Sequence, residues 1–147
     1  MYKSNSSIFS NYNIWLNAVK NDKKTFDELK SIENDEKEIT DRFYCDLKFG
    51  TGGLRGKLVA GKNRMNVYVV SRATRGLAAY INKTTKGNKS VVIAYDSRNM
   101  SREFAFLAAD VFSGAGIKTY VFKTLTPTPI LSFAVRYLKT SAGIVIT

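Results

Sequence analysis

Val91-Val92-Ile93-Ala94-Tyr95 is a continuous apolar run, rich in β-branched residues, and it decides the fold class. Such a run is typical of a strand that is buried on both faces, as in a parallel sheet with helices on each side. Two similar strands are predicted at residues 119–122 and 143–147, and helical patterns separate them. This alternation predicts an α/β fold of three layers, α/β/α, around a mainly parallel, mixed sheet.

Local signals predict where the helices begin and which side they bury. We expect Asn66 to cap a helix at residues 67–83 and Ser101 to cap the next one. Thr126 before Pro127 predicts an N-cap followed by a proline in the first turn of the last helix. Four residues of that helix are predicted to face inward, namely Ile130, Phe133, Ala134 and Tyr137.

The first 46 residues have helical patterns. Amphipathic segments lie at residues 12–20 and 36–44, and Asp22 offers an N-cap for a further helix between them. We therefore predict an N-terminal helical extension at residues 1–46, followed by a single α/β domain at residues 47–147. The acidic residues of the extension are expected to form its solvated outer face.

The composition excludes several classes of protein. A length of 147 residues with 44% hydrophobic and 24% charged residues is typical of one globular domain, not of a disordered or collagen-like chain. The sequence has neither an apolar run long enough to cross a membrane nor the apolar segment of a signal peptide. A single cysteine, Cys45, and the absence of histidine argue against a disulfide framework and a zinc site. We expect a cytoplasmic protein with no membrane partner.

The net charge of +11 is distributed unevenly. Residues 1–46 hold nine acidic and seven basic residues, whereas residues 47–147 hold three acidic and sixteen basic residues. This asymmetry indicates an anionic partner for the second part of the chain: a nucleic acid, a membrane surface or a phosphorylated small molecule. Charge alone does not choose between them.

The loop at residues 50–56 is the strongest candidate for a binding site. Its four glycines allow backbone N–H groups to approach an anion, and Thr51 and Arg55 add a hydroxyl and a planar cation suited to phosphate. The spacing matches neither a dinucleotide-binding fingerprint nor a Walker loop. The alternative is a tight glycine turn between two short strands, which we predict at residues 47–49 and 57–61.

Two other loops follow predicted strands and so lie where open α/β sheets bind ligands. Asp96-Ser97-Arg98 is the first, and its alternative is a local ion pair at the entry to a helix. The second is Thr126-Pro127-Thr128-Pro129, where a helix N-terminus would attract a negative group, or where the residues simply cap a helix. Six other basic residues are expected to be solvated surface charges: Arg64, Arg72, Arg75, Lys83, Lys86 and Lys89.

Taken together, these loops resemble the first domain of the α-D-phosphohexomutases. The closest resemblance is to the bacterial phosphoglucomutase/phosphomannomutase branch, which begins with extra helices. The resemblance covers nearly the whole chain and rests on five segments in the same order: residues 49–56, 60–66, 95–98, 127–129 and 141–147. It is specific for the superfamily and leaves the sugar open, whether glucose, mannose, ribose or an amino sugar.

This resemblance implies part of an isomerase-class enzyme of four domains that interconverts hexose 1-phosphate and hexose 6-phosphate. In that family a phosphoserine transfers its phosphoryl group through a bisphosphate intermediate, and Mg²⁺ is the cofactor. The resemblance places Thr51, Gly52, Gly53 and Arg55 at the sugar-phosphate site, where Arg55 would stabilise phosphoryl oxygens. Arg98 would support the phosphoserine loop.

The phosphoserine loop itself is expected just after Thr147, so neither a catalytic residue nor a metal ligand is expected within residues 1–147. The chain is thus expected to be a truncated first domain that is inactive by itself. Its expected partners are a sugar phosphate and the remaining domains of the same polypeptide.

Two other functions compete with this interpretation. One is a basic nucleic-acid-binding α/β module, which the charge of residues 47–147 suggests, although no groove-reading motif is visible. The other is a stand-alone domain that binds sugar phosphates for regulation. Of these partners, we expect the sugar phosphate and no nucleic acid.

Overall fold

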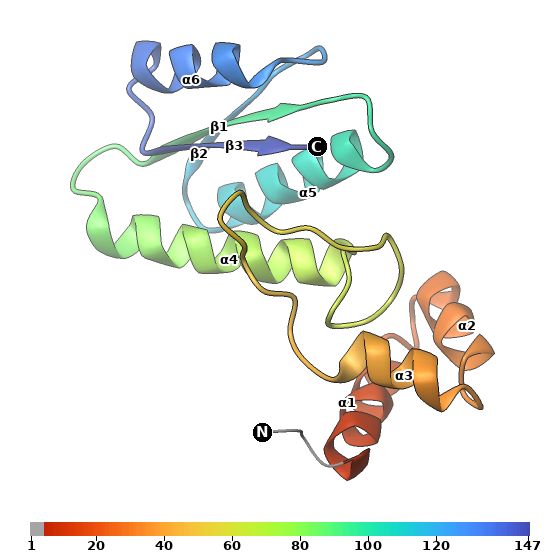
Figure 1. The fold of residues 1–147 in the computed structure, drawn as a ribbon. Helices are drawn as coiled ribbons and strands as arrows, with labels where there is room; N and C mark the ends of the chain where they lie inside the picture. Colours follow the sequence, from red (N-terminus) through yellow and green to blue (C-terminus); the bar gives the residue numbers. More distant parts are fainter. Residues whose placement is uncertain (1–4) are drawn as a thin grey trace. The chain divides into compact units, whose positions relative to one another are not determined.

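Residues 5–147 are described by a computed structural model (Figure 1). They divide into two compact units, one ending at Val69 and the other beginning at Val70. The elements, in chain order, are α1 (Asn5–Ala18), α2 (Lys23–Ser31), α3 (Glu36–Phe43), α4 (Val67–Thr84), β1 (Ser90–Tyr95), α5 (Ser101–Gly114), β2 (Lys118–Val121), α6 (Thr128–Tyr137) and β3 (Ala142–Ile146). The domain limit that we placed between residues 46 and 47 stays a prediction.

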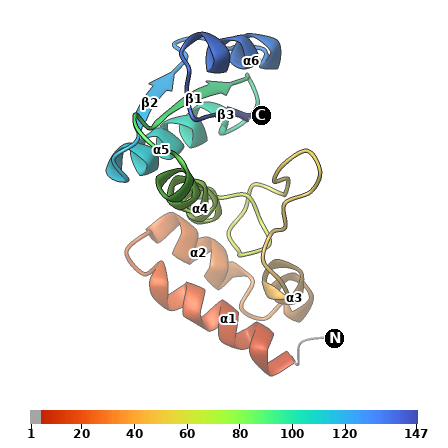
Figure 2. The ribbon, with the colours of Figure 1, turned by 90° about the vertical axis from the view of Figure 1, so that its left-hand side faces the viewer.

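The second unit is a three-layer α/β/α sandwich. Its sheet has the order β2-β1-β3, and β1 pairs in parallel with both neighbours. In register, Ser90 lies opposite Lys118 and Val91 opposite Ala142. Figures 1 and 2 show α4 and α5 on one face of the sheet and α6 on the other. The predicted α/β fold is confirmed, and the sheet formed by the described residues is entirely parallel.

The central strand β1 is buried along its whole length, as its apolar run predicts. Alternate residues contribute to two cores, because successive side chains of a strand point to opposite faces. Val91, Ile93 and Tyr95 pack in one cluster with residues of α4 and α5. Val92 and Ala94 pack in another with Leu131 and Ala134 of α6.

The first unit contains the predicted N-terminal helices, which pack on one another (Figure 2). Asp22 caps α2 as expected, because its Oδ1 accepts a hydrogen bond from the N–H of Thr25 at 3.2 Å. Asp35 caps α3 in the same way through the N–H of Glu38. Leu29, Ile39 and Phe43 are fully buried between the helices, and the rings of Tyr12 and Trp15 meet Phe43 edge-on.

The expected strands at residues 47–49 and 57–61 do not form. Single backbone hydrogen bonds hold this stretch as a loop: Leu47 N–H donates to the carbonyl of Lys62, and Met65 N–H to that of Lys57. An isolated antiparallel bridge joins Gly50 and Gly53. These contacts do not continue into a ladder, so the prediction of two short strands was wrong.

The starts of three helices test the predicted caps. Asn66 caps α4, because its Oδ1 accepts a hydrogen bond from Val69 N–H at 3.0 Å. Ser101 does not cap α5: Met100 stands at the N-cap with φ 65°, and Ser101 is a buried residue of the first turn. For α6 the N-cap is Pro127, one residue later than predicted, and the hydroxyl of Thr126 donates to the carbonyl of Thr124.

The orientation of α6 corrects another prediction. Ala134 is buried against the sheet as expected, together with Leu131. Ile130, Phe133 and Tyr137, which were also predicted to face inward, are all exposed. The apolar arc of α6 is therefore wider than the part of the helix that the sheet covers.

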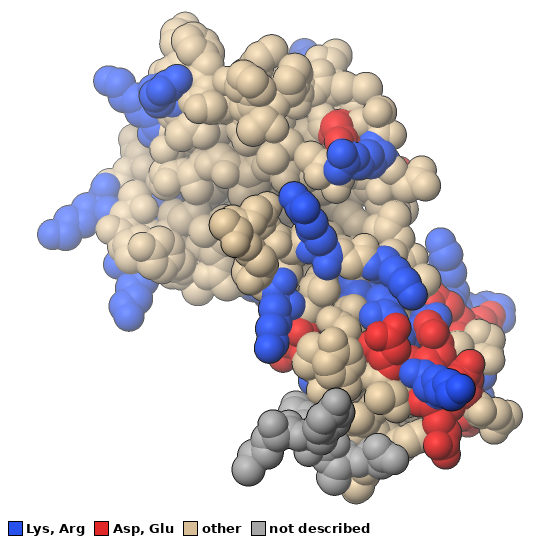
Figure 3. Space-filling model, in the orientation of Figure 1, with Lys and Arg blue, Asp and Glu red and all other residues tan. Residues whose placement is uncertain are grey.

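Nine of the twelve acidic residues lie within residues 1–46. Figure 3 shows most of the visible acidic side chains gathered over the unit that ends at Val69. Among residues 5–147, the helices are all too short or too polar to cross a membrane.

Candidate functional site

The glycine loop folds as a tight turn with Thr51 and Gly52 at its tip. Gly50 and Gly53 exchange two backbone hydrogen bonds, N–H to carbonyl, of 3.0 and 3.3 Å. Gly53 has φ +117°, a conformation that side-chain-bearing residues rarely adopt. The N–H groups of Gly50 and Gly53 are thus engaged in hydrogen bonds within the turn. Thr51 and Gly52, at the tip of the turn, are exposed to solvent.

Arg55 folds back beside this turn. A Cβ added at Gly52 would lie 3.4 Å from Nη2 of Arg55, so the guanidinium rests against the backbone of Gly52. Both residues are exposed. The turn therefore brings together a hydroxyl, a bare backbone and a planar cation within a few residues, which is a combination suited to phosphate oxygens.

A second glycine fixes the loop that follows the turn. Gly61 has φ +135°, and a Cβ there would lie 2.9 Å from Cβ of Arg42 and 3.2 Å from its carbonyl oxygen. The amide of Asn66 donates to the carbonyls of Val59 and Gly61, at 3.0 and 2.8 Å. These contacts tie residues 57–66 to α3 and to the start of α4.

Arg42 holds the same loop from inside the first unit. Its Nη1 donates to the carbonyl of Ala60 at 3.1 Å and to Oε1 of Glu28, while its Nε donates to Glu38 at 2.8 Å. Glu28 Oε1 also accepts the N–H of Ala60 at 2.9 Å. This clamp was not predicted, and its signal in the sequence is limited to the helical spacing of Glu38 and Arg42.

Arg64 is buried, contrary to its prediction as a solvated surface charge. Its Nη1 donates to the carbonyls of Asp41 and Asn63, and its Nη2 forms an ion pair with the carboxylate of Asp41. The acidic partner, Asp41, belongs to α3, whose charges were expected to face solvent. Arg64 therefore stabilises the loop and is not available to a ligand.

The other candidate residue, Arg98, lies in the second unit where β1 and β3 end. Its Nη1 donates to the hydroxyl of Thr147 at 3.2 Å, and its Nε lies 3.4 Å from Oδ2 of Asp96. The N–H of Asp96 donates to the carbonyl of Ile146 at 3.2 Å. Asp96 and Arg98 thus join the carboxyl ends of two neighbouring parallel strands.

Ser101 holds this corner in place. Its hydroxyl donates to Oδ1 of Asp96 at 2.8 Å, and the N–H of Arg98 donates to the same oxygen at 3.0 Å. These contacts explain why Ser101 is buried in the first turn of α5 instead of capping it. The local ion pair that we kept as an alternative for residues 96–98 is present.

The hydrogen bond from the N–H of Arg98 is the main cause that lowers the pKa of Asp96, and Ser101 and the cation of Arg98 lower it further. The folded state thus favours the carboxylate. At pH values above 3.8, the ordinary pKa of an aspartate, the ionised Asp96 stabilises the fold. This contribution is lost as the pH falls through the lower pKa that Asp96 has in the folded state.

Asp96→Asn is therefore expected to lower the free energy of unfolding at neutral pH, with a difference from wild type that shrinks as the pH falls below 3.8. Urea denaturation at several pH values measures it. Asp110→Asn removes the same charge from an exposed position on α5 and serves as the control. A difference that does not change with pH would contradict the assigned ionic role.

The structure brings Thr51, Gly52, Gly53 and Arg55 together in one turn of the first unit, and it places Arg98 in the second unit. The residues at 5–147 form no group of three or more acidic, cysteine or histidine side chains that could hold a metal ion. The carboxylate of Asp96 contacts Arg98 and accepts the hydrogen bonds described above.

Comparison with known proteins gives consistent matches. Residues 46–147 match the family described as phosphoglucomutase/phosphomannomutase, alpha/beta/alpha domain I. A phosphoglucomutase of Staphylococcus haemolyticus is 47% identical over 105 residues, which cover 71% of this chain and 19% of that protein. Another, from Staphylococcus aureus strain bovine RF122 / ET3-1, is 46% identical over 110 residues, which cover 75% of this chain and 20% of that protein.

A third, from Staphylococcus epidermidis strain ATCC 12228 / FDA PCI 1200, is 45% identical over 101 residues, which cover 69% of this chain and 18% of that protein. The chain thus spans about a fifth of the length of the curated relatives that it matches. No solved structure matches it significantly.

Proposed function

Since the chain belongs to the phosphoglucomutase/phosphomannomutase family, with residues 46–147 matching its α/β/α domain I, we propose that it forms part of the sugar-phosphate site of a phosphohexomutase. The proposed reaction interconverts hexose 1-phosphate and hexose 6-phosphate. Glucose is the proposed sugar, because the relatives at 45–47% identity are named phosphoglucomutase.

The observation that carries this proposal is the turn at residues 50–53 with Arg55 folded against it. Phosphoryl transfer depends mainly on positioning and on stabilising charge on the phosphoryl oxygens. The guanidinium of Arg55 supplies two parallel N–H donors for those oxygens, and the hydroxyl of Thr51 supplies a further polar contact. The guanidinium lies close to Gly52, with Nη2 3.4 Å from the place where a Cβ of that residue would stand.

The role proposed for Arg98 is one of support. It ties the end of β1 to Thr147, so it orients whatever segment continues from the end of β3 in a longer mutase. Asp96 and Ser101 hold Arg98 in turn. A segment that carries a phosphoserine would then begin at a fixed place at the carboxyl edge of the sheet, which is where open α/β sheets bind their ligands.

The proposed cofactor of the complete enzyme is Mg²⁺, and a sugar bisphosphate is the proposed intermediate. The described residues do not fit a Mg²⁺ site, because they form no acidic cluster of the required size. We therefore propose that the residues that bind Mg²⁺ lie in the part of the longer relatives that residues 1–147 do not cover. By itself, a polypeptide of residues 1–147 is expected to show no turnover.

A chimera tests the function. In the phosphoglucomutase of Staphylococcus haemolyticus, the aligned segment of 105 residues is replaced by the aligned segment of this chain. We expect turnover of glucose 1-phosphate within about 100-fold of the parent. A displacement of the substituted site residues by about 1 Å would lower the rate on the order of 10²-fold. A coupled assay for glucose 6-phosphate measures it.

The unaltered relative is the positive control, and the polypeptide of residues 1–147 is the negative one. A chimera that folds as the parent does, by circular dichroism and thermal melting, but shows no turnover would contradict the proposed function.

A further inference from the structure

An open pocket lies at the amino edge of the sheet in the second unit, where the parallel strands begin. Its volume is about 820 Å³, which is within the range of small-molecule pockets. We call it the amino-edge pocket. Three of the residues that line it are lysines, Lys89, Lys118 and Lys139, and none of the described residues that line it is acidic. This concentration of positive charge indicates an anionic ligand.

The parallel topology brings the three lysines together. Lys89 directly precedes β1, Lys118 begins β2, and Lys139 lies between α6 and β3. Backbone hydrogen bonds join these connections: Lys118 N–H donates to the carbonyl of Lys89 at 3.0 Å, and Ser141 N–H donates to that of Ser90 at 2.8 Å. The backbone segments that carry the three cations are therefore fixed relative to one another.

The three lysines keep their positive charge available to a ligand. Lys89 Nζ donates to the carbonyl of Asn82 at 3.1 Å, and Lys118 Nζ lies 5.0 Å from the ring centroid of Tyr120. Neither partner carries a charge, and within the described part of the chain none of the three lysines forms an ion pair. Figure 3 shows basic and no acidic side chains on the visible surface around the loop between α4 and β1.

Lys139 has a backbone conformation that favours glycine. Its φ is 51°, in the left-handed region, where a side chain is strained. The residue stands just after α6: its N–H donates to the carbonyl of Arg136 at 3.2 Å, and the N–H of Thr140 donates to that of Val135 at 3.0 Å. This is the pattern of a Schellman motif, in which glycine is the usual residue at this position. A lysine that is kept there despite the strain points to a function of its side chain.

We propose that the amino-edge pocket binds a small molecule that carries several phosphate groups. Neighbouring strands are about 4.8 Å apart, so cations at the beginnings of three adjacent strands are spread over about 10 Å. A single phosphate group cannot contact all three cations, whereas a chain of linked phosphates can. Its oxygens would accept charge-assisted hydrogen bonds from the ammonium groups, which bind phosphate as compact point charges.

Titration calorimetry of the 147-residue chain with sodium tripolyphosphate tests the proposal. One molecule should bind with a dissociation constant on the order of 10⁻⁴ M in about 50 mM salt, because exposed ion pairs are individually weak. Inorganic monophosphate should bind at least about 10-fold more weakly, since it contacts fewer cations. Salt at about 0.5 M should weaken the binding of tripolyphosphate, because ions screen exposed charges.

Lys139→Gly should weaken the binding of tripolyphosphate by about 10-fold, because it removes one charge-assisted hydrogen bond. The same variant should raise the Tm by about 2–4 °C, because glycine adopts the left-handed conformation without strain. A lysine that served only the stability of the fold would show the opposite change in Tm.

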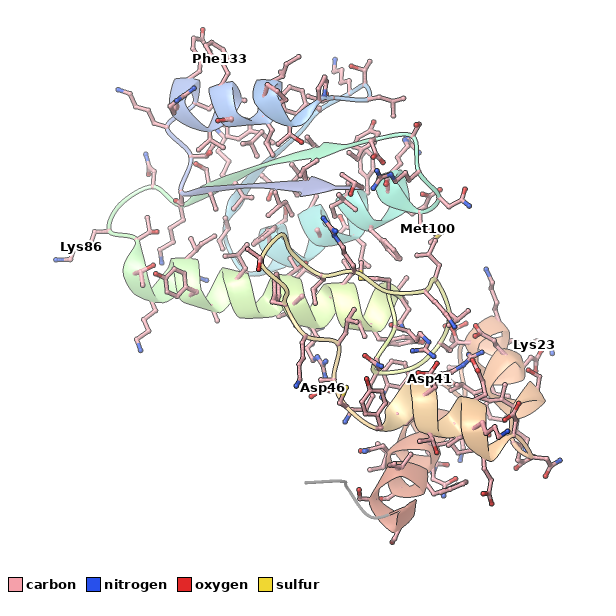
Figure 4. All side chains as sticks on the ribbon, in the orientation of Figure 1. Lys23, Asp41, Asp46, Lys86, Met100 and Phe133 are labelled. Carbon is pink, nitrogen blue, oxygen red and sulfur yellow. The ribbon has the colours of Figure 1, made fainter. Side chains whose placement is uncertain are left out.

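The matched control is Lys86→Gly, which makes the same substitution and removes the same charge from the loop between α4 and β1, outside the lining of the pocket. Figure 4 shows Lys86 projecting from that loop into solvent. This variant should bind tripolyphosphate as the wild type does and should not show the rise in Tm.

Three results would overturn the proposal: a wild-type protein that does not bind tripolyphosphate, equal affinities of the wild type and Lys139→Gly, or equal weakening by the two glycine variants. The first would mean that the lysines serve only the negative ends of the preceding helices. A loss of binding in Arg55→Ala would also overturn it, because the anion would then lie at the turn of the first unit. The proposal does not rest on the mutase function, and the outcome of the chimera does not affect it.

Discussion

Arg55→Ala in the chimera is expected to lower kcat/KM for glucose 1-phosphate by about 10²–10³-fold, the usual cost of removing one preorganised donor to developing charge. The reason is geometric. The guanidinium rests against Gly52 beside the tip of a turn, and its planar fork can bind two phosphoryl oxygens at once. Because Arg55 is exposed, its removal should leave the thermal melting of the chimera unchanged.

Arg55→Lys tests whether activity depends on the positive charge of Arg55 alone or also on the planar shape of its guanidinium. A lysine keeps the positive charge but binds as a point and not as a fork, so an intermediate activity is expected. Arg75→Ala, at an exposed position of α4, removes an arginine from outside the turn and should leave activity near that of the chimera. Equal activities of the Arg55→Ala and Arg75→Ala proteins would refute the role of Arg55.

Arg42→Met is expected to destabilise the first unit by about 2 kcal/mol. Removing one partner of a buried ion pair costs about 3–5 kcal/mol, and we reduce this value because Glu28 and Glu38 are each about a third exposed. The variant removes the cation that joins α2 and α3 to the carbonyl of Ala60, while methionine keeps much of the apolar stem.

Trp15, the single tryptophan of the sequence, contacts Phe43 in the core of the first unit, so its fluorescence during urea denaturation reports on that unit. Lys23→Met is the control, because its ion pair with Asp27 is exposed and should be worth less than about 1 kcal/mol. Hydrogen exchange should also accelerate at the N–H of Ala60, whose acceptor Glu28 loses its cation. An effect of Arg42→Met no larger than that of Lys23→Met would contradict the clamp.

Local patterns allowed much of the fold to be predicted. The apolar run at residues 91–95 is a strand buried on both faces, and Asp22 and Asn66 cap helices as expected. These features depend on residues within a few positions of one another, so the sequence displays them directly. The glycine turn was visible for the same reason, because the conformation of Gly53 and the bridge from Gly50 are local.

The errors concern residues whose partners are distant in the chain. Arg64 is buried because Asp41, 23 positions earlier, accepts its hydrogen bonds. Residues 57–61 stay a loop because α2 and α3 hold them through Glu28 and Arg42. Ser101 is an exception, because the partner that turns its hydroxyl away from the cap is Asp96, only five positions earlier.

The sequence by itself determined the order of the helices and of the three strands from residue 90 onward, and the turn that presents Arg55, because propensity, capping and periodicity are local. Only the tertiary structure decided which arginines are buried and which side of α6 is covered. Periodicity shows that α6 has a wide apolar arc but not how much of it the sheet covers. That limit depends on Val92 and Ala94, which meet Leu131 and Ala134 and leave Phe133 and Tyr137 in solvent.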